Sequence, residues 1–256
     1  MYINVLSRNG IGRLPKMSRR VALWLRRVLI VAKSSARRET YSEKDIRARL
    51  SMGIEYIRWA EVTGDVAEFG TMSGRTASIM SMALSKFDTE ARKSRKIHLF
   101  DSFEGLPQAQ SAVDMDSPYV KSGVWGVGTC IGITKDELRS MCGRFLSRER
   151  IVIYEGWFKD TLPRILDDVK FAMVHIDCDM YQSTIEVLTY LFKNRHISEG
   201  SALFFDDYSC NKASPEFGER RAWEEAVNNF SVVFSDCGEY GWSGRKFIVH
   251  NYKGMA

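Results

Sequence analysis

Short apolar runs alternate with amphipathic segments along most of this chain, and that alternation constrains the fold more than any other feature. Five runs have the length and composition of buried strands: residues 65–69, 96–100, 150–154, 171–176 and 201–205. Segments with helical spacing lie between them, near residues 76–86, 135–145, 161–168 and 181–194. Strand and helix in succession predict βαβ units, and therefore an α/β fold whose mostly parallel sheet has helices on both faces.

The regions that flank these units extend the prediction. Ser42 followed by Asp45 predicts a capped helix start, and apolar residues then recur at helical spacing to about Val62. Near the end, residues 215–230 predict another helix, and two strands, 231–234 and 246–250, are joined through the glycine-rich stretch 238–244. The sheet is therefore expected to end in an antiparallel hairpin. The irregular stretch 104–133 follows a strand end and is expected to form a lid.

Positive charge is concentrated at the start of the chain. Residues 1–40 hold ten Lys and Arg against one acid, whereas the other 216 residues carry 27 basic and 31 acidic side chains. We therefore expect a basic N-terminal extension, 1–40, and a main domain, 41–256, whose mildly acidic balance argues against nucleic-acid binding. The apolar run 21–32 is too short and too charged to span a bilayer. Residues 16–38 are expected either to pack on the domain or a partner subunit, or to rest on an anionic membrane surface.

The five cysteines are odd in number, widely spaced and never arranged as C-x-x-C. This usage favours reduced thiols over a disulfide framework or a zinc site. We expect a cytoplasmic protein, at the inner membrane surface if the basic segment binds lipid, and a homo-oligomer.

A glycine turn follows the first predicted strand, in the segment E-F-G-T-M-S-G from Glu68 to Gly74. Its spacing fits neither the nucleoside-triphosphate loop nor the dinucleotide fingerprint. Glu68 would repel a pyrophosphate, but it suits S-adenosylmethionine, which carries an ammonium and a sulfonium and no phosphate. Asp101, at the end of the second predicted strand, is placed to accept hydrogen bonds from ribose hydroxyls. A purely structural turn is the alternative.

Aspartates follow two later strands. Asp177 and Asp179 come after one strand, and Asp206 and Asp207 come after the next, with Asp206 29 positions after Asp177. Carboxylates in one cleft repel each other unless a hard cation binds there, and ligands that are all oxygen favour Mg²⁺. A helix cap or a turn is the alternative for an Asp-Asp pair. His175, within an apolar strand, is expected to be a core residue rather than a catalytic one.

Together these motifs resemble the macrocin, mycinamicin and novobiocin group of O-methyltransferases. The resemblance rests on E-F-G-x-x-x-G-R-T, F-D-S-F-E-G-L-P, E-G-W-F-x-D-T-L-P, H-I-D-x-D-M-Y-x-S-T and F-D-D-Y with G-E-R-R-A-W, in order over residues 42–250. It implies a Rossmann-like class I methyltransferase fold with a seven-stranded sheet. It also implies Mg²⁺ held by Asp177, Asp206 and Asp207, with Asp177 as proton acceptor. The implied cofactor contacts are Glu68, Gly70, Thr71, Ser73, Gly74, Thr76, Asp101, Ser102, Phe103, Glu155, Gly156 and Asp177.

The implied reaction is methyl transfer from S-adenosylmethionine to a hydroxyl of a small, sugar-bearing molecule. Mg²⁺ would make that hydroxyl more acidic, a carboxylate would take its proton, and residues 156–161 would border the site.

The D-x-D of Asp177 and Asp179 leaves two other enzyme classes open, a metal-dependent phosphatase and a glycosyltransferase. In the phosphatases this motif normally opens the fold, whereas three strand–helix units precede it here. The glycosyltransferase interpretation gives Glu68 and Gly74 no role. A non-catalytic, membrane-associated binding protein would leave the aspartates unexplained.

Overall fold

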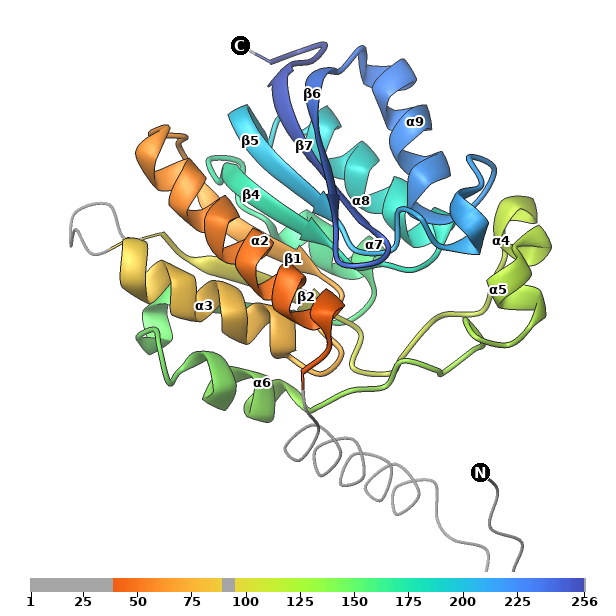
Figure 1. Cartoon of the computed structure of the whole chain (residues 1–256), viewed down its shortest axis with the longest axis horizontal. Coiled ribbons are helices and arrows are strands. Elements are labelled where there is room, and N and C mark those ends of the chain that lie inside the picture. Colours follow the sequence, from red (N-terminus) through yellow and green to blue (C-terminus); the bar gives the residue numbers. More distant parts are fainter. Residues whose placement is uncertain (1–38, 89–94, 256) are drawn as a thin grey trace, which may run out of the picture. The chain divides into compact units, whose positions relative to one another are not determined.

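The computed structural model describes residues 39–88 and 95–255. This part of the chain forms a seven-stranded sheet with the order β3-β2-β1-β4-β5-β7-β6 (Figure 1). Among these strands, β7 runs antiparallel to β5 and β6, and the other pairs are parallel, so the predicted parallel sheet with a C-terminal hairpin is confirmed. The strands are β1 (Asp65–Phe69), β2 (Ile97–Asp101), β3 (Ile151–Glu155), β4 (Phe171–Ile176), β5 (Ile197–Phe205), β6 (Val233–Tyr240) and β7 (Gly244–Asn251).

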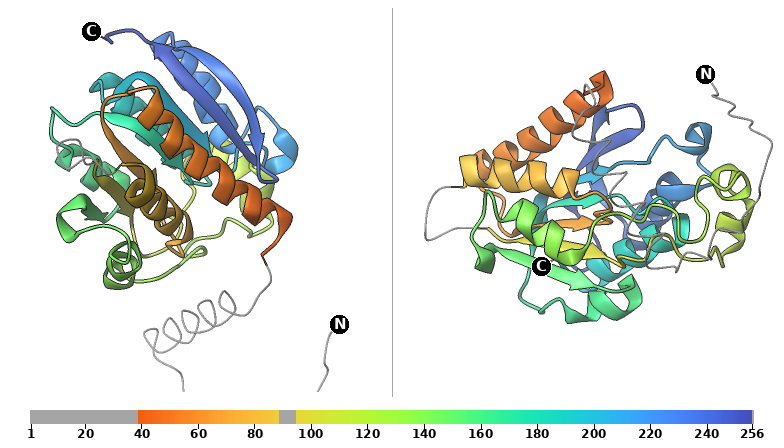
Figure 2. Two further views of the ribbon diagram at one scale, coloured as in Figure 1. Left: turned by 60° about the vertical axis from the view of Figure 1, so that its left-hand side comes forward. Right: turned by 90° about the horizontal axis from the view of Figure 1, so that it is seen from below.

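Helices cover both faces of the sheet (Figure 2). Side chains of α2, α3 and α6 share one hydrophobic core with the sheet, and side chains of α8 and α9 share another. The helices are α2 (Tyr41–Trp59), α3 (Arg75–Phe87), α4 (Ala112–Asp116), α5 (Pro118–Lys121), α6 (Lys135–Cys142), α7 (Phe158–Thr161), α8 (Tyr181–Lys193) and α9 (Gly218–Phe230).

Strand β1 shows how one short segment serves both cores. Val66 is buried in the α2 and α3 core, whereas Ala67 and Phe69 are buried in the α8 and α9 core. Successive side chains of a strand point to opposite faces, so a strand covered on both sides needs apolar residues almost without interruption. Glu68 interrupts this run, and it faces the same side as Val66.

Two local predictions are wrong. The first helix is capped by Thr40, whose side chain accepts a hydrogen bond from the backbone of Glu43, and not by Ser42 with Asp45. The helix expected over 161–168 is reduced to α7 and a single 3-10 turn, Leu162–Arg164. Pro163 explains the second error, because proline lacks a backbone N–H and cannot continue a helix that begins before it.

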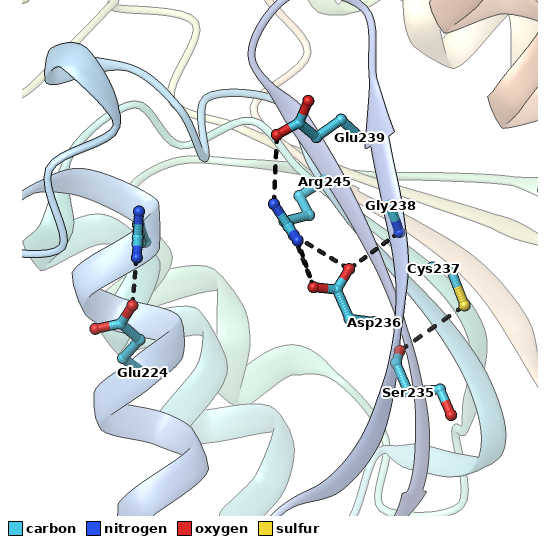
Figure 3. A network of polar contacts seen from close by, with 8 residues as sticks. Glu224, Ser235, Asp236, Cys237, Gly238, Glu239 and Arg245 are labelled. Carbon is cyan, nitrogen blue, oxygen red and sulfur yellow. Dashed lines mark hydrogen bonds and ion pairs between the residues drawn. The ribbon is translucent and has the colours of Figure 1, made fainter.

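The C-terminal hairpin is longer than predicted. Gly238 lies within β6, at an irregularity in the pairing with β7, and has a φ of 87° that a glycine adopts readily. Only residues 241–243 therefore form the connection. Arg245 of β7 reaches the carboxylates of Asp236 and Glu239 on β6 and ties the two strands together (Figure 3).

The stretch 104–133 contains α4 and α5 and is tied to the domain at two points. The carboxylate of Asp114 accepts hydrogen bonds from the backbone N–H groups of Tyr181 at 2.8 Å and Gln182 at 3.0 Å, at the start of α8. The side-chain oxygen of Asn211 accepts from the Ser117 hydroxyl and from the Tyr119 backbone N–H. Segments far apart in the sequence are thereby held together beside the strand ends.

The expectations for the basic N-terminal segment, including its apolar run, fall on residues 1–38, which lie outside the described residues. Of the helices that the structure describes, none is both long and apolar enough to cross a membrane.

We expect Trp223→Ala to lower the free energy of unfolding by about 3 to 5 kcal/mol, because deleting a buried aromatic side chain leaves a cavity. Trp223 is 1% exposed within the α8 and α9 core, and it stacks on Phe247. Trp242 is 65% exposed, so Trp242→Ala is the matched control. Urea unfolding followed by circular dichroism measures both variants. Equal urea midpoints for Trp223→Ala and Trp242→Ala would contradict this account of the core.

Candidate active site

The glycine turn after β1 lies directly against the turn after β4. A Cβ added to Gly70, whose φ is +88°, would lie 1.9 Å from the backbone oxygen of Asp177. The backbone N–H of Asp177 also donates to the carbonyl of Phe69 at 2.9 Å. Glycine is therefore required at this point, because any side chain would push the first turn away from the aspartates.

Asp101, at the end of β2, organises the glycine turn. One of its carboxylate oxygens accepts hydrogen bonds from the backbone N–H groups of Thr71 at 2.7 Å and Met72 at 3.0 Å, and from the Thr71 hydroxyl. The other oxygen accepts from the backbone N–H of Phe103 at 2.6 Å. A carboxylate can accept from several donors at once, so Asp101 both shapes the turn and borders the cavity beside it.

Glu68, His175 and Asp206 form a row of charged groups across the ends of β1, β4 and β5. Glu68 and His175 are both 0% exposed, and His175 Nδ1 lies 3.0 Å from Glu68 Oε1. On the other side, His175 Nε2 lies 3.6 Å from Asp206 Oδ1. Burial lowers the pKa of His175, but the carboxylates of Asp206 and Glu68 outweigh burial and raise it to about 10. The two carboxylates therefore favour the protonated, cationic form of this buried histidine.

The aspartates after β4 and β5 converge. Oxygen atoms of Asp177, Asp179 and Asp207 all lie within 4.8 Å of one another. Asp206, predicted from the sequence as a ligand, stands outside this group and pairs with His175 instead, while Asp179 takes part. Burial and the neighbouring carboxylates raise the pKa of Asp177 and Asp179, and they raise that of Asp207 to about 6. Three close oxygens with raised pKa values suit a hard divalent cation.

A cavity of about 520 Å³ joins the glycine turn to the aspartates. Its volume is in the range of small-molecule sites. The residues predicted from the sequence that line it are Gly70, Asp101, Ser102, Gly156, Asp177, Asp206 and Asp207.

Other cavity residues carry weak sequence signals. Gln108 and Gln110 come from an irregular stretch, and Gln182 and Ser183 lie on the first turn of a helix that was otherwise predicted as packing. Further residues of this kind are Met72, Gly105, Leu106, Pro107, Cys130, Cys178, Met180 and Glu186. Trp157, Phe158 and Lys159 also line the cavity, and they belong to the segment 156–161 that the sequence predicted to border the site. Asp179, of the predicted D-x-D motif, lines it as well.

The remaining predicted cofactor residues lie behind or beside the cavity wall. Glu68 is turned toward His175, and Glu155 forms an ion pair with Lys135 at 3.2 Å. Gly74 sits at the start of α3, where a Cβ would lie 2.7 Å from Ile133. The residues predicted from the sequence that do not line the cavity are Glu68, Thr71, Ser73, Gly74, Thr76, Phe103 and Glu155.

The sheet order, the antiparallel β7, the glycine turn after β1 and the acid after β2 together define a Rossmann-like class I methyltransferase fold. The macrocin O-methyltransferase (TylF) family model matches residues 43–233. The chain belongs to this family and is an S-adenosylmethionine-dependent O-methyltransferase.

Two relatives are similar in sequence, and two solved structures share the fold. Demethyldecarbamoylnovobiocin O-methyltransferase of Streptomyces niveus is 28% identical over 72% of this chain and 68% of its own length. A rhamnosyl-tetracenomycin-C 4'-O-methyltransferase of Streptomyces olivaceus is 29% identical over 65% of this chain and 62% of its own length. The O-methyltransferase NovP shares the fold with a TM-score of 0.67, 22% identity and 84% coverage of both chains. The calicheamicin methyltransferase CalS11 shares the fold with a TM-score of 0.64 and 18% identity, over 94% of this chain and 99% of its own.

The raised pKa values predict how stability depends on pH and metal. A carboxyl whose pKa rises on folding binds its proton more tightly in the folded state than in the unfolded state. The metal-free protein should therefore lose stability as the pH rises from about 4, the ordinary pKa of an aspartate, to about 6, the pKa of Asp207 in the folded protein. A Mg²⁺ ion bound by these carboxylates would compete with these protons. We therefore expect Mg²⁺ to raise the melting temperature of chelator-treated protein more at about pH 7.5 than at about pH 5.5. Equal shifts at both pH values, measured by differential scanning fluorimetry, would argue against ion binding by these carboxylates.

Proposed function

We propose that this enzyme methylates a hydroxyl of a sugar carried by a natural product or glycan, with assistance from Mg²⁺. One observation carries the proposal: a single cavity is bordered by the glycine turn and Asp101 on one side and by a cluster of three carboxylates on the other. The relative from Streptomyces olivaceus, by its name, methylates a rhamnosyl group. The phosphatase and glycosyltransferase interpretations gain no support from the comparisons.

The half of the cavity next to β1 and β2 is suited to the cofactor. Asp101 offers a carboxylate at the strand end where Rossmann-type folds bind ribose hydroxyls, and Gly70 lets a ligand approach the backbone. Ser102 and Gly156 complete this side. Glu68 would act through His175 rather than by direct contact, because its carboxylate is buried away from the cavity.

The half of the cavity next to α8 is suited to a polyol. Gln108, Gln110, Gln182 and Ser183 offer amides and a hydroxyl that both donate and accept hydrogen bonds. Trp157 adds an aromatic surface against which the apolar face of a sugar ring can lie. A lining of this kind can bind the hydroxyls of a substrate that carries no charge.

Asp177, Asp179 and Asp207 would hold the Mg²⁺ ion, with Asp206 at its edge. The fit rests on the short separations between their oxygens and on the raised pKa values, which indicate carboxylates held together against repulsion. Bound there, Mg²⁺ would lower the pKa of the acceptor hydroxyl. Asp177, next to the glycine turn, would take the hydroxyl proton as the oxygen attacks the methyl group.

We expect Asp177→Asn to lower turnover by about 100- to 10,000-fold, because it removes the proposed base and a metal ligand together. Binding of S-adenosylhomocysteine, measured by isothermal titration calorimetry, should largely survive, since most of the implied cofactor contacts lie at or just after β1 and β2 and Asp177 is only one of the others. Turnover is measured as transfer of labelled methyl groups to a panel of rhamnosides. Asp167→Asn, an exposed site between α7 and β4, is the control. An Asp177→Asn enzyme with full turnover would exclude this role.

We propose that methyl transfer does not need residues 1–38 of the basic N-terminal extension. Arg75, at the start of α3, pairs with Glu43 at 2.8 Å and Glu39 at 3.4 Å, so a truncation should keep these two acids. We expect a chain of residues 39–256 to retain full turnover and to lose binding to anionic lipid vesicles. A chain of residues 45–256, without the Thr40 cap, should melt at a lower temperature. A folded 39–256 chain without turnover would contradict the proposal.

A further inference from the structure

Glu219 joins the two turns that carry the aspartates. It lies in the first turn of α9, and its carboxylate is fully buried. One oxygen accepts a hydrogen bond from the backbone N–H of Cys178 at 3.0 Å, and the other accepts from the backbone N–H of Asp207 at 2.9 Å. Cys178 stands between Asp177 and Asp179, and Asp207 is itself one of the clustered carboxylates. One side chain therefore holds both halves of the cluster.

The position of Glu219 is fixed by the packing of α9. Ala222, Trp223 and Ala226 of this helix are buried in the core shared with α8. At the start of the helix, Gly218 has a φ of +59°, and a Cβ there would lie 3.4 Å from the backbone oxygen of Asp179. The helix thus begins against the turn after β4, and the carboxylate has little freedom to move.

The chemistry of this contact requires a carboxylate of this length. Two backbone N–H groups from different strands point at one side chain, and a carboxylate offers two equivalent acceptor oxygens in one plane. Burial and Asp207 raise the pKa of Glu219, whereas the two backbone hydrogen bonds oppose that shift. Glu219 neither lines the cavity nor belongs to the group of close oxygens, so its contribution is made through the two turns.

We propose that Glu219 is a positioning residue that sets the spacing between Asp177, Asp179 and Asp207 and thereby the affinity for a divalent ion. This inference rests on the proposed role of Mg²⁺. The clustered carboxylates repel one another, and they lie in the turns after two strands, β4 and β5, whose ends could move apart. Hydrogen bonds from both turns to one rigid helix oppose that separation, so the ligands are arranged before the ion arrives.

Two substitutions separate position from charge. Glu219→Gln keeps the size of the side chain, but it replaces one acceptor oxygen with an NH₂ group that faces a backbone N–H. Glu219→Asp keeps the charge, but it is one methylene too short to reach both turns. Glu224→Gln, on the same helix, removes a surface ion pair with Arg220 and serves as the matched control.

The experiment measures binding of Mn²⁺ to the purified full chain by the loss of the free-ion signal in electron paramagnetic resonance. We expect both Glu219 variants to raise the Kd for Mn²⁺ about tenfold or more, because each loses a charge-assisted hydrogen bond. The Kd for S-adenosylhomocysteine, measured by isothermal titration calorimetry, should match that of Glu224→Gln. This second measurement also shows that each variant is folded.

The outcomes are distinct. If the unaltered chain binds no Mn²⁺, the proposed metal function fails, and this inference fails with it. If the unaltered chain binds Mn²⁺ and both Glu219 variants bind it equally well, only the positioning role is overturned. Weakening by Glu219→Gln alone would show that charge matters and not position, which also overturns the proposal. Should Glu219→Gln fail to fold, Glu219→Asp decides, because a variant that keeps the charge and loses affinity supports positioning.

Discussion

Repulsion among the carboxylates at the ends of β4 and β5 is the constraint on which the rest of the site depends. Asp177, Asp179 and Asp207 crowd together, and burial raises the pKa of each. The surrounding structure opposes the repulsion from two directions. His175 places a positive charge beneath the cluster, and Glu219 fastens the two turns to α9. A divalent ion would supply the remaining compensation, as buried charges require partners.

The sheet order explains why the cavity forms where it does. The order of the parallel strands reverses between β1 and β4, and ligands of open α/β sheets bind at such switch points. The parallel register pairs Glu68 with His175 and His175 with Phe204. Asp206 lies two positions after Phe204, just beyond the end of β5, and there its carboxylate reaches His175. At the same edge, Gly70 lets the first turn touch the backbone of Asp177. The glycine turn on one side of the cavity is therefore in direct contact with the aspartate turn on the other side.

Local patterns predicted the elements better than the contacts between them. The strands Asp65–Phe69 and Phe171–Ile176 have the predicted bounds, because an apolar run between turn residues is a local signal. Glu68 was expected to face the cofactor, but its direction depends on the register of β1 and β4, which the sequence does not reveal. Glu219 belongs to the G-E-R-R-A-W motif, but its role could not be predicted, since its partner Cys178 lies 41 positions away. Such long-range contacts need the packed helix to be in place.

The hairpin completes the support of the aspartate turn after β5. The Ser243 hydroxyl donates to the carbonyl of Asp206 at 2.6 Å, and the guanidinium of Arg245 lies 5.7 Å from the ring centre of Tyr208. Helix α2 also holds the connection between β6 and β7, because the backbone N–H of Gly241 donates to the carboxylate of Asp45 at 2.8 Å. Asp206 and Asp207 are thus supported by α9 and the hairpin, and through the hairpin by α2. A shift in any one of these elements would change the separation of the carboxylates, so the antiparallel strand β7 is part of the site's construction as well as of the fold.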